Sequence, residues 1–309
     1  MQQKTLGSSC TFEGKGLHTG TLSRIVVNPA PADTGILFRS SVGGACTDIR
    51  PLASNVSSTA RSTTISEGGV PVHTIEHLMS ALTGMDIDNA IIEIDNVEVP
   101  ILDGSASYYV EAFAKAGTVI QDSPRRLIKV PQVIEVSDPQ SGSWVRISPA
   151  EETTYDITVD FGSRVLGVQN AHFGKDVDYA SGIGVCRTFV FFHEIQYLLA
   201  NNLIKGGDID NAIIIVEHPV SQEQLDAMAA SLGKPRLEVT PAGYLSNLTL
   251  HYPNECGRHK LLDLIGDLRL VGGFLKGRSK LSNPDMASTP GPLPRFWKFW
   301  DNNHARIPV

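Results

Sequence analysis

The chain has 309 residues, of which 41% are hydrophobic and 19% charged, and it carries a formal net charge of -7 at pH 7. These values are typical of a globular protein long enough for two domains, and the acidic excess gives no broad attraction to nucleic acid. The four cysteines, Cys10, Cys46, Cys186 and Cys256, form no Cys-x-x-Cys pair, so they indicate buried thiols rather than a disulfide framework or a cysteine zinc site.

In chain order, the apolar pattern predicts a strand at Ser23 to Val27 and a helix at Thr74 to Leu82, where apolar residues recur at helical spacing. An isoleucine-rich strand follows at Ala90 to Ile94. Turn-forming residues from Ile120 to Arg126 indicate a linker. The remaining predicted elements are strands at Leu127 to Val136, Trp144 to Ser148 and Tyr155 to Phe161, a helix at Phe189 to Leu203, and a strand at Ala212 to Val216.

One heptapeptide, Asp-Ile-Asp-Asn-Ala-Ile-Ile, occurs at residues 86–92 and again at residues 208–214. This separation is too long for a solenoid repeat and favours two related domains. We therefore predict an α+β fold of two similar layered α/β sandwich domains, residues 1–122 and 127–278, from an internal duplication, with the active site in the cleft between them. We interpret Asp88 and Asp210 as closing the turn ahead of a strand in each copy.

Two short motifs carry groups that suit a metal. His259 and Asp263 are four residues apart, so on a helix they project from one face, which Asp267 continues. Glu76-His77 adds an imidazole and an adjacent carboxylate. Each motif alone is more often a solvated surface pair. Joined across a cleft between domains, the two imidazoles and Asp263 match the ligand count of a catalytic zinc, with Glu76 as the base.

Five ordered blocks carry a resemblance that extends over about residues 3 to 278: Gly16-Leu17-His18-Thr19-Gly20, Thr74-Ile75-Glu76-His77-Leu78, Ile101-Leu102-Asp103-Gly104-Ser105, Arg187-Thr188-Phe189 and His259-Lys260-Leu261-Leu262-Asp263-x-x-Gly266-Asp267. Together they resemble the zinc-dependent UDP-3-O-acyl-N-acetylglucosamine deacetylases of lipid A synthesis. The resemblance implies two similar α/β domains with the metal between them. It also implies that His77, His259 and Asp263 hold Zn²⁺.

The resemblance assigns roles to further residues. Zinc would polarise the acetamide carbonyl and lower the pKa of a bound water, while Glu76 takes the proton of that water. The Thr188 hydroxyl would stabilise the oxyanion together with zinc, and Lys260 would add positive potential. Asp267 would orient a ligand or a catalytic imidazole. The candidates for substrate and acyl-chain contact are Phe189, His18 and the apolar segment Val165 to Phe173.

Some of these motifs also have plainer interpretations. Without the resemblance, His18 is better interpreted as a turn residue, and Asp103 before Gly104 is an ordinary turn signal. Gly14-Lys15-Gly16 and Gly182-Ile183-Gly184 each lack the third glycine of a dinucleotide fingerprint. We therefore reject an enzyme with a nucleotide cofactor.

The C-terminal segment departs from the family pattern. A Pro/Ser-Gly-His-x-x-Asn motif, whose histidine is a second catalytic group, is expected where this chain has Pro284-Asp285-Met286. Without that histidine the rate is expected to fall roughly 10²- to 10⁴-fold, whereas zinc binding should survive. A one-nucleotide shift of frame can restore Pro-Gly-His, so we hypothesise a frameshift near Ser279 and expect residues 279–309 to form a disordered tail. The DNA sequence of this region tests the hypothesis.

No apolar stretch of signal-peptide length lies between Met1 and Phe12, and the longest aliphatic run, Ala212 to Val216, is far short of a membrane span. We therefore expect a cytoplasmic protein that is a monomer, with transient inner-membrane contact left open because the implied substrate carries a lipid chain.

The expected function is zinc-dependent hydrolysis of the N-acetyl group of UDP-3-O-acyl-N-acetylglucosamine, the committed step of lipid A biosynthesis. The alternative is a catalytically impaired relative that still binds zinc and the UDP-acyl-sugar. A third interpretation is a pair of α/β domains with a structural role and no metal.

Overall fold

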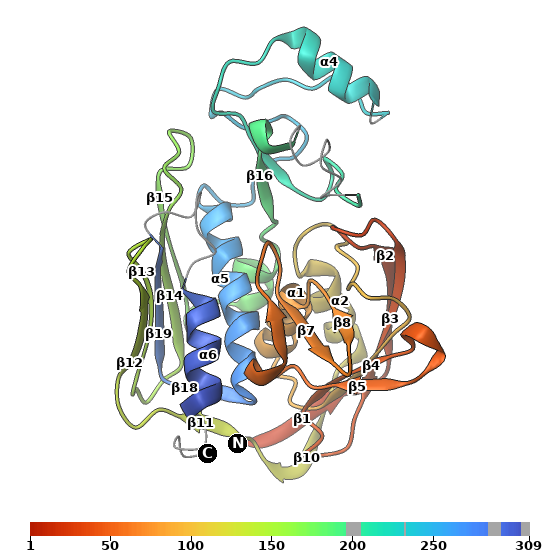
Figure 1. The fold of residues 1–309 in the computed structure, drawn as a ribbon, viewed down its shortest axis with the longest axis vertical. Coiled ribbons are helices and arrows are strands. Elements are labelled where there is room, and N and C mark those ends of the chain that lie inside the picture. Colours follow the sequence, from red (N-terminus) through yellow and green to blue (C-terminus); the bar gives the residue numbers. More distant parts are fainter. Residues whose placement is uncertain (196–204, 232, 284–291, 304–309) are drawn as a thin grey trace.

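The computed structural model describes residues 1–195, 205–231, 233–283 and 292–303. Two five-stranded sheets form the outer layers, and helices lie between them (Figure 1). The mixed α+β class predicted from the sequence is confirmed. Within the described residues, no helix is long and apolar enough to cross a membrane.

The first sheet has the strand order β2-β3-β9-β4-β5. Its central strand β9 runs antiparallel to β3 and parallel to β4. On β3, Ile25 and Val27 are buried while Leu22 and Arg24 are exposed, the period of two that a sheet with one covered face requires. The bounds of the strands are Cys10–Lys15 for β2, Leu22–Pro29 for β3, Ala90–Ile94 for β9, Ile36–Ser40 for β4 and Thr47–Ile49 for β5.

The second sheet repeats this arrangement with the order β12-β13-β19-β14-β15. Its central strand β19 runs antiparallel to β13 and parallel to β14. Strands β9 and β19 therefore occupy the same place in two sheets of the same topology. The bounds are Ile134–Asp138 for β12, Ser143–Ser148 for β13, Arg278–Asn283 for β19, Thr154–Asp160 for β14 and Val168–Phe173 for β15.

The two heptapeptide copies do not occupy equivalent places in these sheets. The first copy leads into the central strand β9. The second leads into β17 (Ile213–Ile215), which pairs with β16 (Phe189–Phe191) in a separate two-stranded parallel sheet. The topological counterpart of β9 is β19, whose sequence shows no copy of the heptapeptide.

Two helices pack against each other between the sheets. These are α1 (Glu76–Gly84) and α5 (Glu255–Leu268), and every residue of α1 from Glu76 to Thr83 is buried. Gly266 of α5 permits the close approach, because a Cβ atom there would lie 2.1 Å from the carbonyl oxygen of Glu76. The contact brings the first turn of α1 next to the middle of α5.

Smaller elements surround this centre. Strand β1 (Gln2–Leu6) pairs with β10 (Thr118–Pro124), and β11 (Leu127–Lys129) pairs with β18 (Phe274–Lys276). The other elements are β6 (Val56–Ser58), β7 (Thr64–Glu67), β8 (Val70–Val72), α2 (Ser107–Ala116), α4 (Gln222–Ser231) and α6 (Leu293–Asn303). Figure 1 shows β16 and α4 extending beyond the two main sheets.

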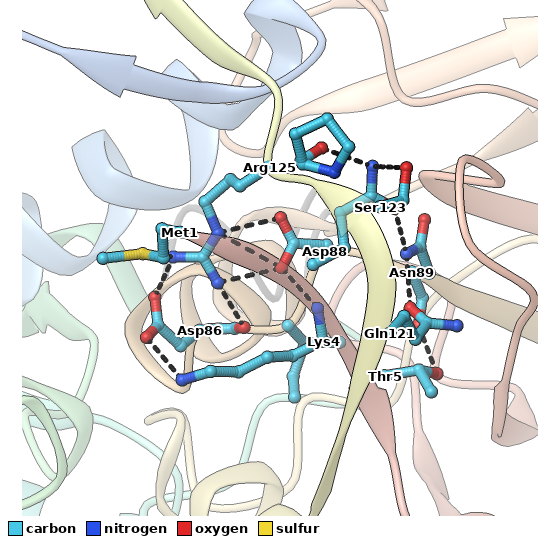
Figure 2. Close-up of polar contacts among 12 residues, drawn as sticks. Met1, Lys4, Thr5, Asp86, Asp88, Asn89, Gln121, Ser123 and Arg125 are labelled. Carbon is cyan, nitrogen blue, oxygen red and sulfur yellow. Dashed lines mark hydrogen bonds and ion pairs between the residues drawn. The ribbon is translucent and has the colours of Figure 1, made fainter.

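A polar network ties the first heptapeptide to the N-terminal strand (Figure 2). Both carboxylate oxygens of Asp88 accept hydrogen bonds from Arg125, and Oδ2 also accepts one from the Lys4 amide at 2.8 Å. Asn89 donates to the side chains of Gln3 and Gln121, each at 2.7 Å. Asp88 therefore holds β1 and the chain after β10 together, whereas Asp210 is exposed and pairs with Lys234.

Four sequence predictions are wrong in part. Cys10, Cys186 and Cys256 are buried as predicted, but Cys46 is exposed. The predicted linker Ile120 to Arg126 lies largely within β10, which supplies the partner that β1 needs. The predicted strand Leu127 to Val136 is two strands in different sheets, separated by Pro131, which has no N–H for a ladder. The predicted helix from Phe189 begins as strand β16; residues 192–195 are helical, and residues 196–203 lie outside the described part.

The described part of the C-terminal segment also differs from the expectation of disorder. Residues 279–283 belong to β19, and α6 buries Phe296, Trp297 and Trp300 in the main hydrophobic core. These aromatic side chains share one helix face, so their burial stabilises the helix. Met286 lies outside the described residues. The division into two domains stays a prediction.

Candidate metal centre

Three side chains meet where α1 and α5 pack. His77 comes from the first turn of α1, and His259 and Asp263 come from successive turns of α5. The Nε2 atoms of His77 and His259 each lie 3.5 Å from Oδ1 of Asp263. The possible ligand atoms of the three residues all lie within 4.8 Å of one another, which makes them the candidate metal-binding group of the described residues.

The His259 ring is oriented by the main chain. Its Nδ1 lies 3.1 Å from the carbonyl oxygen of Cys186, which can only accept, so Nδ1 carries the proton and donates. The lone pair of Nε2 then faces Asp263. Burial lowers the pKa of His259 to about 4, so the ring is neutral near pH 7, as a metal ligand must be.

Asp263 supplies the carboxylate. Its Oδ2 accepts a hydrogen bond from Nζ of Lys260 at 3.1 Å, while Oδ1 is buried and makes no hydrogen bond with the described residues. Burial opposes ionisation, but His259, Lys260 and His77 together lower the pKa of Asp263 below its ordinary value. A charged oxygen without a hydrogen bond, beside two imidazole nitrogens, fits a divalent cation with nitrogen and oxygen ligands.

The surroundings of His77 also fit a bound cation. Burial lowers its pKa, but contact with Asp263 more than reverses this effect, so the pKa lies above the ordinary value. The position between Asp263 and Glu76 therefore favours positive charge, which either a proton or a bound cation supplies. The residues present thus fit a metal on chemical grounds as well as by their spacing.

Glu76 lies beside the metal group at the start of α1. Its side chain is buried, and Oε2 accepts a hydrogen bond from the Thr63 amide at 3.1 Å. Burial raises the pKa of Glu76 to about 7, although the charge of His77 opposes the rise. A carboxyl group with this pKa exchanges protons readily near neutral pH, which suits a general base.

Thr63 links Glu76 to Asp267. The Thr63 hydroxyl donates to Oδ1 of Asp267 at 2.6 Å, while its amide donates to Glu76. Burial and the nearby Glu76 raise the pKa of Asp267 well above its ordinary value. The sequence predicts that Asp267 orients a ligand or a catalytic imidazole; in the structure its side chain accepts a hydrogen bond from Thr63. Sequence reasoning missed Thr63, because a threonine in a Ser/Thr-rich loop carries no motif signal.

A cavity of about 240 Å³ adjoins the metal group through Lys260. Lys260 lines the cavity and also bonds Asp263, and its ammonium lies 5.5 Å from the centre of the Phe189 ring. His18, Thr188 and Phe189, three of the residues singled out from the sequence, also line it. Its apolar lining comes from Leu17, Val190, Ile195, Ile209, Ile214 and Met228.

Thr188 is held in place by the Ile101–Ser105 block. Its amide donates to the Gly104 carbonyl at 2.8 Å. Gly104 has φ +78, and a Cβ atom there would lie 1.9 Å from the carbonyl oxygen of Asn211, so this position requires glycine. Asp103 accepts hydrogen bonds from Ser105 and Ser107, which matches its interpretation as a turn residue.

Two other features lie apart from this cavity. The segment Val165 to Phe173, suggested for the acyl chain, includes the edge strand β15, and none of its residues lines the cavity. A larger cavity of about 440 Å³ is lined by Arg50, Met79 and Arg269 among others, and by none of the candidate site residues.

Comparison with known proteins places most of the chain in one family. A family model described as UDP-3-O-acyl N-acetylglycosamine deacetylase matches residues 3–229 and 236–284. The UDP-3-O-acyl-N-acetylglucosamine deacetylase of Helicobacter hepaticus is 36% identical over 278 residues, which cover 90% of this chain and 84% of that protein.

Two longer relatives are each named as a bifunctional enzyme LpxC/FabZ. The protein of Porphyromonas gingivalis is 43% identical over 308 residues, and that of Bacteroides thetaiotaomicron is 41% identical over 285 residues. The matches cover 100% and 92% of this chain, but only 67% and 62% of the relatives. The chain therefore spans about two thirds of the length of these bifunctional relatives.

Proposed function

The chain belongs to the UDP-3-O-acyl N-acetylglycosamine deacetylase family, and from this premise we propose that it is a zinc-dependent enzyme that hydrolyses the N-acetyl group of UDP-3-O-acyl-N-acetylglucosamine. The products are acetate and the free amine, and the reaction is the committed step of lipid A biosynthesis. The observation that carries the proposal is the buried group of His77, His259 and Asp263, with Glu76 beside it.

His77, His259 and Asp263 are the proposed zinc ligands. Two observations support this assignment: Oδ1 of Asp263 makes no hydrogen bond within the described part of the chain, and Nε2 of His259 is oriented toward Asp263. When bound, zinc would supply Lewis acidity toward the acetamide carbonyl and lower the pKa of a coordinated water.

Glu76 is the proposed general base. Its pKa of about 7 lets the carboxylate accept a proton from the attacking water near neutral pH. The Thr63 amide donates to Oε2 of this carboxylate at 3.1 Å, which fixes its orientation. The resulting geometry is fixed before substrate binds, which lowers the entropic cost of reaching the transition state.

Thr188 and Lys260 are the proposed stabilisers of the oxyanion that develops on the acetamide oxygen. Although burial lowers the pKa of Lys260, the carboxylate of Asp263 raises it above its ordinary value, so the ammonium stays charged. Phe189 and His18 would contact the sugar, and the apolar lining that includes Ile195 and Ile214 would contain the acyl chain. This assignment replaces the Val165 to Phe173 segment, which lies outside the cavity lining.

We also propose that the two halves arose by duplication, with the metal group at their junction. The shared strand order and directions of the two five-stranded sheets support this origin. The heptapeptide copies do not, because they precede strands in different topological positions.

The impaired relative remains the second candidate. The family match ends at residue 284, two residues before Met286, which stands where the family pattern has a histidine. A methionine donates no proton to the leaving amine, so the expected rate is roughly 10²- to 10⁴-fold lower than with a positioned acid. Sequencing the DNA of codons 276–309 shows whether a Pro-Gly-His frame exists.

Acetate release from UDP-3-O-acyl-N-acetylglucosamine tests the proposed function. The purified chain is assayed before and after metal stripping and again with zinc restored. Glu76→Gln should abolish turnover, while Glu111→Gln, a matched change at an exposed position of α2, should not. Zinc bound at about one equivalent without turnover would favour the impaired relative, and absence of bound zinc would refute both.

A further inference from the structure

Glu98 is a buried carboxylate outside the metal group. It lies four residues after the end of β9 and forms an isolated bridge with His73. Its side chain is 0% exposed. A buried carboxylate is costly unless hydrogen-bond donors replace the water it has lost, so its surroundings indicate what it does.

Four donors surround the Glu98 carboxylate. Oε1 accepts from the amide of His18 at 3.0 Å and from the hydroxyl of Thr74 at 2.9 Å. Oε2 accepts from the amide and the hydroxyl of Thr19, at 2.9 and 2.7 Å. Burial opposes ionisation, but these donors lower the pKa of Glu98 below its ordinary value, so the group is a charged acceptor.

These bonds join two segments that are more than fifty residues apart in the sequence. The first is the turn Gly16 to Gly20, and its residues Leu17 and His18 line the cavity beside Lys260. The second is the chain just before α1, which carries Glu76 and His77. Glu98 is therefore hydrogen-bonded both to a turn that lines the cavity and to the segment just before α1, the helix that carries Glu76.

The backbone conformation is restricted in both segments that Glu98 joins. Thr74 has φ +59, a conformation that a β-branched residue rarely adopts, and its hydroxyl bond to Glu98 holds it there. Gly16 lies so close to the carboxylate that a Cβ atom would be 2.3 Å from Oε2. Both features lie at the points where Glu98 contacts the two segments.

We propose that Glu98 is a positioning residue, which fixes the Gly16 to Gly20 turn relative to the start of α1 and thereby sets the width of the substrate cavity beside Lys260. Glu98 acts through His18, Thr19 and Thr74 and touches no reacting atom. The inference rests on the proposed function for its kinetic consequence but not for its structural one.

Glu98→Gln tests the proposal, because the amide NH₂ group is a donor and must face donors of the turn. Glu93→Gln is the matched control, the same change at an exposed position of β9. Hydrogen exchange of the intact chain should become about tenfold faster in residues 14–21 and 70–78 of Glu98→Gln, as lost charge-assisted bonds imply. Exchange in β14 should not change.

Steady-state kinetics give the second readout. We expect KM for UDP-3-O-acyl-N-acetylglucosamine to rise by about tenfold in Glu98→Gln and kcat to fall less, because the turn forms a wall of the binding cavity. Glu93→Gln should match the wild type. Loss of general stability alone would not separate KM from kcat and would speed exchange throughout the chain.

Thr19→Val keeps the proposal testable if Glu98→Gln does not fold, because it removes the hydroxyl bond to Glu98, together with the bonds that this hydroxyl accepts from Thr21, and preserves the volume. It should show the same local exchange with a smaller rise in KM. Unchanged exchange in both segments, or an unchanged KM in the folded variant, would overturn the proposal. A wild-type chain without any deacetylase activity would refute the proposed function instead, and the exchange comparison would still decide whether Glu98 positions the turn.

Discussion

At the scale of single residues, the candidate site depends on hydrogen-bond donors that orient acids. Thr63 donates through its amide to Glu76 and through its hydroxyl to Asp267, and Glu98 accepts from two segments at once. Each of these contacts joins residues that are distant from one another in the sequence. The sequence shows the acidic residues as candidate catalytic groups by their type, but it does not show which residues donate hydrogen bonds to them.

Thr63→Val should lower kcat by roughly tenfold, since leaving a buried hydrogen-bonding group without its partner costs about 1–3 kcal/mol. The valine keeps the amide bond to Glu76 and loses only the hydroxyl bond to Asp267. Thr63→Ser, which restores the hydroxyl, should recover most of the activity. Equal kcat values for the valine and serine variants would show that the hydroxyl has no role in turnover.

The stability contribution of Glu98 should depend on pH. Its pKa is lower in the folded chain than the ordinary value that it has when unfolded. Such a group stabilises the fold above its unfolded pKa, and the contribution is lost as the pH falls through the folded pKa. The difference in unfolding free energy between wild type and Glu98→Gln should therefore be full at pH 7 and shrink below about pH 4. Urea unfolding at several pH values measures it, and a difference independent of pH would contradict this account.

At the scale of elements, the packing of α1 on α5 assembles the metal group. Because His77 belongs to one helix and His259 and Asp263 to the other, any change in the distance between the helices separates the ligands. Gly266 sets that distance by letting the two backbones touch. The helix contact and the chemistry are therefore coupled.

Gly266→Ala should destabilise the chain by about 1–3 kcal/mol, as overpacked sites do, and weaken zinc binding. The new Cβ would meet backbone atoms of α1, which cannot move aside without shifting the helix. Gly257→Ala on the same helix is the control, because the three atoms nearest to its Cβ all belong to Gln169 on β15 and not to α1, so it crowds α5 from another side. Urea unfolding and zinc titration measure both effects; similar results for the two variants would mean that the helix spacing is not critical.

Helix α6 provides a test of the expected disorder of the tail. Trp300 is 4% exposed in the main core, so Trp300→Ala should cost about 3–5 kcal/mol if the helix packs in solution. Phe299→Ala, at a side chain 36% exposed, should cost much less. Urea unfolding compares the two variants. Equal stability of Trp300→Ala and wild type would restore the prediction of a disordered tail.

At the scale of the whole molecule, the proposed metal group joins α1 to α5, two helices far apart in the sequence, so zinc should stabilise the folded chain. A ligand that binds only the folded state at 100 times its dissociation constant adds about 2.7 kcal/mol. We expect chelation to lower Tm and zinc to restore it. His77→Ala should lose this response, whereas His172→Ala, at an exposed ring on β15, should keep it. Thermal unfolding measures the response, and an unchanged Tm after complete zinc removal would contradict the proposed site.

The sequence alone determined the α+β class, the strands with clear alternation and the short motifs that carry candidate ligands. Strand β9 has the predicted bounds, and His259 and Asp263 lie on one face of α5, because period and spacing within one element are local properties. The tail helix α6 was missed because its burial depends on partners elsewhere in the chain.

Only the tertiary structure decided which distant segments meet. It paired β1 with β10 and brought His77 to His259. It also made β19, and not the strand after the second heptapeptide, the counterpart of β9 as the central strand of a five-stranded sheet. It also placed Glu98 beside the Gly16 to Gly20 turn, and Thr63 beside Glu76 and Asp267. Contacts between distant segments depend on how whole elements pack and on where a glycine lets backbones touch, and neither leaves a repeat or a spacing in the sequence.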